Sequence, residues 1–353
     1  MAMPSTPEII EHFAEQARFC EIYGSPFMAR LLEALGKDLA AGGPTARLVG
    51  EWPRSPRTDA LAIRLAGALH AAVLAGREPA LAAEYPAASP AWNIERVWPL
   101  ARDFLVREHD WVARFLGSAP QTNETRRTIA LLAGFLWLAA RHDRELELLE
   151  IGASAGMNLH WDRFAYRTAG WRWGDGDVQI STEWTGPAPP LDAVPRIRSR
   201  AACDLNPIEL RDPAERLRLR AYVWADQAER LARFDAAAAL AVAHGAQVER
   251  ADAAEWLEAR LPQRSPDALT VVYHSVFYQY PRLETRQRIA RAIEQAGERG
   301  PAPLAWLRLE PEAVLGGPRD SVRFVVDLVT WPGGERRTLA ITDGHGNFVT
   351  ALA

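Results

Sequence analysis

The stretch that most constrains the fold of this chain is LELLEIGASAGMNLHWDRF, residues 146–164. An apolar run ends at Glu150, two glycines then flank a serine, and a helix-like segment follows. A strand, a tight turn and a helix in this order are typical of an α/β sheet whose turns face a ligand. Three kinds of enzyme use such a unit, as a dinucleotide phosphate loop, a hydrolase nucleophile elbow or an S-adenosylmethionine (SAM) loop.

The sequence patterns before and after this stretch differ. Up to residue 144, apolar residues recur at three- and four-residue spacing, which predicts an N-terminal helical region over residues 1–144. Its last segment, 122–143, is mostly apolar and should form a buried helix. From residue 145, short apolar runs alternate with helical stretches, as in a parallel sheet with crossover helices. We therefore expect a Rossmann-like α/β domain over residues 145–353.

The α/β region contains a series of candidate strands and helices. The strands cover residues 146–151, 197–203, 247–251, 268–274, 304–309, 323–330 and 338–342, and helical segments cover 212–244, 252–261 and 282–299. The last two strands are separated by WPGGERR, and Pro-Gly-Gly is a turn signal, so they should pair as an antiparallel hairpin. Residues 162–193 are not helical and should form a β-rich insertion, with a hairpin that turns at Ala169-Gly170 and a further strand in DVQISTEW.

Composition and charge exclude several classes of function. The net charge of −4 gives no overall basic field for nucleic acid. The longest uncharged apolar run, 128–140, is too short to span a bilayer, and the N-terminus has no secretory signal pattern. The two cysteines are far apart, and no Cys or His spacing suggests zinc. We expect a cytoplasmic protein without a metal and without a nucleic-acid or membrane partner, and the sequence does not set its oligomeric state.

A dinucleotide-binding loop is the first interpretation of the glycine turn. The G-x-G-x-x-G pattern needs its middle glycine so that the backbone can approach the pyrophosphate. Here Ser154 occupies the middle position, and its Cβ would lie where the phosphates must pass. NAD or FAD binding is therefore disfavoured, although Gly152 and Gly156 remain.

A serine hydrolase is the second interpretation. The turn matches G-x-S-x-G literally, and the strand-to-helix context suits a nucleophile elbow at Ser154. Such a nucleophile needs a histidine and usually an acid, in the chain order Ser, Asp or Glu, His. The late histidine, His345, follows its nearest acid, Asp343, by only two residues, which makes that acid a poor orienting partner. Asp252 with His274 is the other pairing, but it places the histidine at the end of an inner strand.

A SAM-binding loop is the third interpretation, and it explains the position of Glu150. SAM carries a methionine ammonium and carboxylate and no phosphate, so an acid two positions before Gly152 can bind the ammonium directly or through water. Backbone N–H groups at the start of the helix after Gly156 can bind the carboxylate. Ser154 is then tolerated, and its hydroxyl can donate a hydrogen bond to the ligand.

Acidic side chains follow two further candidate strands. Asp204 follows the strand at 197–203 and is placed to accept hydrogen bonds from the ribose hydroxyls, or it only caps the turn before Pro207. Asp252 follows the strand at 247–251 near the expected adenine site, and it can also be the N-cap of the next helix. The sequence leaves these alternatives open.

The α/β region resembles the fold of SAM-dependent methyltransferases, and this resemblance implies that chemistry on an acceptor takes place at the strand end in VVYHSVFYQYP, residues 271–281. His274 and Ser275 end this strand. Histidine is the side chain best suited to move a proton near neutral pH, so His274 is the candidate catalytic base. A structural histidine is the alternative.

These stretches together resemble two known groups of proteins. Five β/α steps followed by an antiparallel hairpin resemble the layout of class I SAM-dependent methyltransferases. The segments PQTNETRR, LLEIGASAGMNLHWDRFAY, CDLNPIEL, RADAAEWL and VVYHSVFYQYP resemble the bacterial family catalogued as domain of unknown function 2332, over nearly the whole chain. That family has no established activity, and the resemblance implies a methyltransferase-like core behind a helical N-terminal region.

The resemblance adds residues to the expected cofactor site. The GASAG-x-N-L stretch contributes Asn158, and the strand end contributes His274 and Ser275. In this fold the helix before the first strand often borders the SAM site, so Gln121, Asn123 and Arg127 are candidate ligand contacts. A plain helix N-cap is the alternative for this segment.

We expect a SAM-dependent methyltransferase that acts on a small-molecule acceptor, whose identity the sequence does not give. The alternatives are a serine hydrolase that uses Ser154 and a non-catalytic protein that binds an adenosyl ligand. Four tryptophans in and beside the insertion can line an acceptor pocket or pack the insertion onto the sheet: Trp161, Trp171, Trp173 and Trp184.

Overall fold

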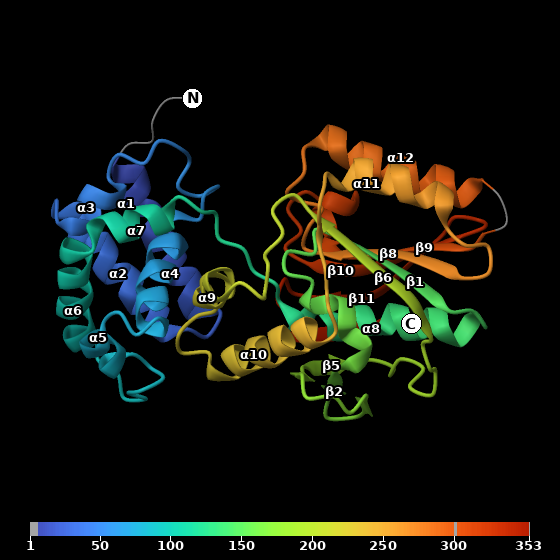
Figure 1. Ribbon diagram of the computed structural model, residues 1–353, viewed down its shortest axis with the longest axis horizontal. Helices are drawn as coiled ribbons and strands as arrows, with labels where there is room; N and C mark the ends of the chain where they lie inside the picture. Colours follow the sequence, from blue (N-terminus) through green and yellow to red (C-terminus); the bar gives the residue numbers. More distant parts are fainter. Residues whose placement is uncertain (1–5, 300–301, 353) are drawn as a thin grey trace. The chain divides into compact units, whose positions relative to one another are not determined.

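The computed structural model describes residues 6–299 and 302–352, and the chain divides into two compact units. The first unit is Met1–Thr122 with Arg211–Ala232, and the second is Asn123–Leu210 with Arg233–Ala353. In the described residues the first unit contains helices and no strand, whereas the second contains a large sheet with helices (Figure 1).

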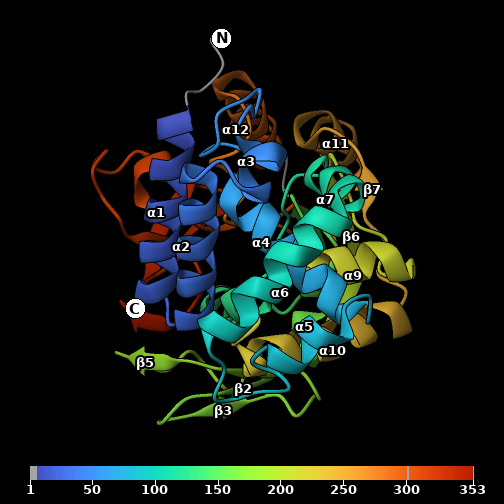
Figure 2. The ribbon, with the colours of Figure 1, turned by 90° about the vertical axis from the view of Figure 1, so that its left-hand side faces the viewer.

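The helical unit is built from helices that pack around a shared apolar core. They are α1 (Thr6–Ile22), α2 (Pro26–Ala40), α3 (Pro44–Val49), α4 (Leu61–Leu74), α5 (Pro79–Glu84), α6 (Ile94–Arg107), α7 (His109–Leu116) and α9 (Pro213–Ala221). α1 and α2 pack side by side (Figure 2). In α2, Phe27, Leu31 and Leu35 recur at four-residue spacing and are fully buried, as the helical period requires.

The division of the chain differs from the boundary expected at residues 144 and 145. Residues 211–232 return to the helical unit, because Tyr222 and Ala225 lie in its core and Asp226 accepts the Phe27 N–H at 3.0 Å. Conversely, α8 (Thr128–Arg141) packs on the sheet strands of the second unit. α10 (Ala228–Ala243) runs across the boundary between Ala232 and Arg233. An apolar stripe shows which face of a helix is buried, but it does not show which surface covers that face. The sequence pattern therefore could not assign these helices to one unit or the other.

The second unit is a mixed α/β structure with a nine-stranded, mostly parallel sheet. Its strands are β1 (Leu146–Ile151), β5 (Glu183–Thr185), β6 (Ile197–Asp204), β7 (Glu249–Arg250), β8 (Leu269–Ser275), β9 (Leu304–Pro311), β10 (Phe324–Trp331), β11 (Glu335–Thr342) and β12 (Phe348–Ala351). Their order is β5-β12-β11-β10-β9-β8-β1-β6-β7. The five strands from β9 to β7 are parallel, and β10 and β11 form the expected antiparallel hairpin.

Helices cover both faces of the sheet. α11 (Ala253–Arg260) and α12 (Leu283–Glu298) cover one face, where Trp256 and Ile289 pack with Val272 of β8, and α8 covers the other (Figure 1). Short 3-10 helices lie at Thr125–Arg127, Met157–Arg163, Leu261–Gln263 and Glu312–Leu315. Within the described ranges, no helix is both long and apolar enough to cross a membrane.

The insertion between β1 and β6 forms a second, small sheet. It contains β2 (Ala165–Arg167), β3 (Arg172–Trp173) and β4 (Gln179–Ser181), and β2 and β3 pair as the hairpin expected at Ala169-Gly170. The single strand expected in DVQISTEW is instead two, because the chain changes sheets at Thr182. The hydroxyl of Thr182 donates to the Gly346 carbonyl at 2.7 Å, and β5 then pairs with β12 at the edge of the large sheet.

The tryptophans in and beside the insertion pack against other aromatic rings. Trp161 is fully buried and stacks on Phe135 with ring centroids 4.0 Å apart. Trp173 stacks on Trp161 at 6.1 Å, and Trp171 meets Trp184 edge to face at 4.9 Å. This arrangement favours the packing alternative over an open acceptor pocket.

Candidate functional site

The order of the parallel strands reverses between β1 and β8, and this point marks the candidate site. β6 and β7 lie beyond β1 on one side, and β9 lies beyond β8 on the other. In open α/β sheets, ligands bind outside the carboxyl ends of the strands where the order reverses. Glu150 lies near the end of β1, and His274 and Ser275 end β8.

The loop after β1 is a tight turn in which every second residue from Gly152 to Gly156 has a left-handed backbone conformation. Gly152, Ser154 and Gly156 have φ values of +67°, +54° and +70°. A Cβ on Gly152 would lie 2.1 Å from the Phe277 ring, so both the backbone angle and the close approach require glycine there. Ser154 adopts the same region at a cost of about 1–2 kcal/mol, so the surrounding contacts must hold it in place.

Asp204, at the end of β6, supplies such contacts. Its carboxylate accepts the N–H of Ser154 at 2.9 Å and the N–H of Asn206 at 2.8 Å. The turn-capping alternative is therefore present in the structure. An ionised carboxylate has about four acceptor positions, so two bonds leave capacity for the hydroxyls of a ligand.

Glu150 is buried at the end of β1, and the neighbouring strand holds its side chain. It is 3% exposed, and the Tyr273 hydroxyl of β8 donates to its Oε2 at 3.1 Å. Burial raises the pKa of Glu150 to about 8, the Tyr273 hydrogen bond opposes this shift, and the Asp204 carboxylate adds to it. Near neutral pH the carboxyl therefore retains a proton, and a cation beside it would favour ionisation.

Among the residues that the structure describes, a buried polar atom in the loop and another in the 3-10 helix that follows it have no hydrogen-bond partner. They are Ser154 Oγ and Asn158 Oδ1, on side chains that are 7% and 2% exposed. An unpaired buried polar atom costs about 1–3 kcal/mol, so such atoms are candidates to bind a ligand or an ordered water.

The segment after Gly156 differs from the expected α-helix. It is a 3-10 helix, Met157–Arg163, with a kink at His160. The first N–H of this segment, on Met157, is bonded to Asn123 Oδ1 at 3.0 Å. The expected α-helix is therefore replaced by a 3-10 helix whose first N–H is already paired, and carboxylate binding at this segment stays a prediction.

The segment before α8 contacts the site through Asn123 and Arg127. Asn123 holds the loop at Met157, and the Arg127 guanidinium donates to the Gly344 carbonyl at 2.7 Å and to the Ser275 carbonyl at 3.4 Å. Gln121 belongs to the helical unit, whereas Asn123 belongs to the sheet unit.

Asp252 follows β7 and caps α11. Its Oδ1 accepts the N–H of Ala254 at 2.9 Å and the N–H of Glu255 at 3.2 Å, which is the helix-cap alternative. In the described part of the chain, no group of three or more His, Cys, Asp or Glu side chains is arranged to hold a metal ion.

His274 is fully buried, and both of its ring nitrogens are used inside the protein. Nδ1 lies 2.6 Å from Glu310 Oε1, and Nε2 lies 3.1 Å from the indole N–H of Trp306. The indole can only donate, so Nε2 accepts, and Nδ1 donates to Glu310. Burial lowers the pKa of His274, which favours this neutral tautomer. The expected catalytic base is therefore placed as a structural histidine.

Sequence reasoning missed three residues that shape the site. Tyr273 bonds Glu150, and Glu310 accepts the Phe277 N–H at 2.8 Å and so holds the ring that covers Gly152. Between them Val276 has a φ of +53°, a strained value for a β-branched residue. The signal available in the sequence was a buried acid on each of two inner strands, which needs a donor on a neighbouring strand.

The nucleophile-elbow interpretation has one observation in its favour and two against it. Ser154 has the positive φ of a strained turn. Its Oγ, however, contacts no hydrogen-bond partner in the described residues, so no histidine activates it there. His274, the histidine at the neighbouring strand end, is bonded to Glu310 and Trp306.

These features define a Rossmann-like α/β protein with an added helical unit. The chain belongs to the family described as "Uncharacterized protein conserved in bacteria", domain of unknown function 2332, whose profile matches residues 10–351. This match confirms the resemblance to that family. Neither the comparison with curated proteins nor that with solved structures gave a match.

Proposed function

We propose that this protein binds SAM at the carboxyl ends of β1 and β8 and transfers the methyl group of SAM to a small-molecule acceptor. The observation that carries the proposal is the pair of carboxyl groups, Glu150 and Asp204, on adjacent parallel strands beside a tight loop where the strand order reverses. SAM offers both groups a partner, because its methionine end carries an ammonium group and its ribose hydroxyls are hydrogen-bond donors.

The residues of the loop fit this ligand. Glu150 would hold the ammonium, and Asp204, which already fixes Ser154, would accept from the ribose. The unpaired oxygens of Ser154 and Asn158 would then gain the partners that the protein alone does not give them. When bound, SAM supplies an electrophilic methyl group on sulfur, and the protein supplies position and exclusion of water.

No proton transfer is assigned to His274, because both of its nitrogens are bonded inside the protein. Catalysis would rest on holding the acceptor in line with the methyl group. A non-catalytic adenosyl-binding protein with the same loop would also bind the product S-adenosylhomocysteine (SAH). Transfer of labelled methyl groups from SAM to a panel of small acceptors separates the two functions.

The affinity for SAH is expected to rise with pH through Glu150. Because the free carboxyl has a pKa of about 8 and the bound ammonium needs the ionised form, affinity should increase up to pH 8, with proton release on binding. The gain should be at most about tenfold per pH unit. Calorimetric titrations between about pH 6 and 8, in two buffers of different ionisation enthalpy, measure both quantities.

Glu150 is also expected to make the stability of the ligand-free protein depend on pH, in the direction opposite to its effect on ligand affinity. The folded protein keeps a proton that the unfolded chain loses above the usual pKa of 4.5, so its free energy of unfolding should fall as pH rises from 4.5 towards about 8. Glu150→Gln should bind SAH weakly at every pH and lose both dependences. A Glu150→Gln protein that kept the pH dependence of binding would assign it to another group.

Ser154→Ala is expected to stay folded and to bind SAH within about tenfold of the wild type, because it removes one hydrogen-bonding group at most. The wild type should not react with a fluorophosphonate probe, since no histidine contacts Ser154 Oγ in the described structure. Mass spectrometry of the treated protein measures labelling. Stoichiometric labelling of the wild type that disappears in Ser154→Ala would replace the proposal by a serine hydrolase.

A further inference from the structure

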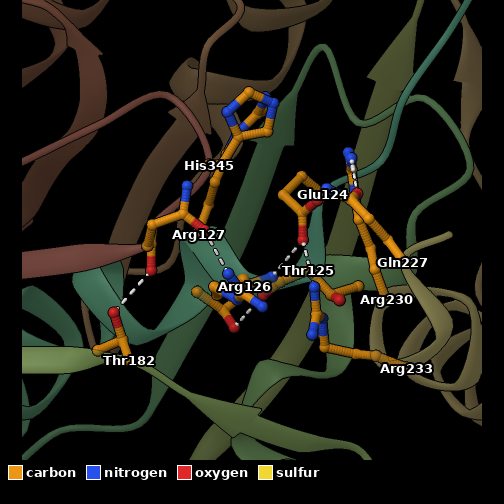
Figure 3. Close-up of polar contacts among 12 residues, drawn as sticks. Glu124, Thr125, Arg126, Arg127, Thr182, Gln227, Arg230, Arg233 and His345 are labelled. Carbon is orange, nitrogen blue, oxygen red and sulfur yellow. Dashed lines mark hydrogen bonds and ion pairs between the residues drawn. The ribbon is translucent and has the colours of Figure 1, made fainter. Parts of the chain in front are cut away.

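Residues 123–127, which we call the strap, contact several segments of the sheet unit. At one end, Asn123 Oδ1 accepts the Met157 N–H at 3.0 Å. At the other end, Arg126 bonds the Asn347 side chain, and Arg127 donates to the Gly344 carbonyl at 2.7 Å. The strap thus links the loop after β1 to the turn between β11 and β12. Figure 3 shows Glu124, Thr125, Arg126 and Arg127 of the strap.

A buried ion pair fixes the middle of the strap. Glu124 Oε1 accepts from the Arg233 guanidinium of α10 at 3.2 Å, and it also accepts the N–H of Arg126 at 3.1 Å. Both charged side chains are buried. A buried ion pair is costly to break, so the pair favours one position of the strap.

The ion pair lies beside two places where the chain passes from one unit to the other. These passages are between Thr122 and Asn123 and between Ala232 and Arg233. The pair therefore joins Glu124, the second residue of the sheet unit after the first passage, to Arg233, the first residue after the second passage. Asn123, next to Glu124, extends this restraint to the loop after β1.

We propose that Asn123 is a positioning residue for the Gly152–Met157 loop, and that the Glu124–Arg233 pair acts on ligand affinity through it. Asn123 uses its side-chain oxygen on the Met157 N–H, so it acts through the loop rather than on the ligand. The effect on SAH rests on the proposed function, whereas the effect on the loop does not.

Hydrogen exchange of the Met157 amide tests the loop directly and needs no ligand. Asn123→Ala should speed this exchange at least about tenfold, because the N–H loses its acceptor. Asn123→Asp keeps an oxygen in place and should restore the slow exchange. Unchanged exchange in Asn123→Ala, or no rescue by Asn123→Asp, would overturn the inference whether or not SAH binds.

SAH titration tests the coupling. Glu124→Gln keeps an acceptor for Arg126 but weakens the pair, and it should lower SAH affinity and speed Met157 exchange without further loss in the double variant with Asn123→Ala. Glu258→Gln, which weakens the exposed ion pair with Arg288 between α11 and α12, is the control for loss of an acidic charge elsewhere in the sheet unit and should change neither. If the losses of SAH affinity in Glu124→Gln and Asn123→Ala add up in the double variant, the ion pair does not act through Asn123. If the wild type does not bind SAH, the proposed function is wrong, whereas the inference about the loop still stands on the exchange of the Met157 amide.

Discussion

Glu310→Ala is expected to lower the free energy of unfolding by about 2–6 kcal/mol, because it leaves two donors without their acceptor at a cost of about 1–3 kcal/mol each. One carboxylate oxygen of Glu310 accepts both from His274 Nδ1 at 2.6 Å and from the Phe277 N–H at 2.8 Å. Urea denaturation measures the change, and Glu298→Ala, on the exposed side of α12, should stay within about 0.5 kcal/mol of the wild type.

This variant also tests the structural role of His274. A histidine that moved protons would lose turnover with little change in stability when its partner was removed. A structural histidine loses its hydrogen-bond acceptor and destabilises the end of β8. A loss below about 0.5 kcal/mol in Glu310→Ala would contradict the structural role.

Asp204→Ala is expected to weaken SAH binding by about 1–3 kcal/mol, or roughly five- to 150-fold. The variant loses the proposed bonds to the ribose and also the acceptor that holds Ser154 in its strained conformation. Asp204→Asn keeps one acceptor oxygen and should bind with intermediate affinity. Asp267→Ala, an exposed acid before β8, is the control and should bind as the wild type does. Equal affinity in Asp204→Ala and Asp267→Ala would exclude Asp204 from the binding site.

The local structure of the sheet unit could be predicted because its inner strands are apolar and bounded by turn residues. β1 begins and ends at the expected residues, 146 and 151, and the α12 helix differs from expectation by one residue at each end. The change of sheet at Thr182 could not be predicted, because it depends on a bond to Gly346, far away in sequence. The return of residues 211–232 to the helical unit could not be predicted either, because their apolar residues could pack against either unit.

The candidate site was predicted at the level of strand ends and not at the level of partners. Glu150 and Asp204 could be placed because acids rarely follow inner strands without a reason. The partner of Glu150, Tyr273, depends on the register of β1 against β8, and the partners of His274 depend on β9. A histidine that ends a strand has the same sequence pattern whether it faces a ligand or Glu310.

Calorimetric titration of the wild-type protein with SAH tests the central claim most directly. We expect one saturable site per chain, a dissociation constant in about the micromolar range, and a rise in melting temperature with ligand concentration. Adenosine or methionine alone should bind more weakly, since each reaches only one of Glu150 and Asp204. No heat and no shift in melting temperature at about millimolar SAH would contradict SAM binding and, with it, the methyltransferase proposal.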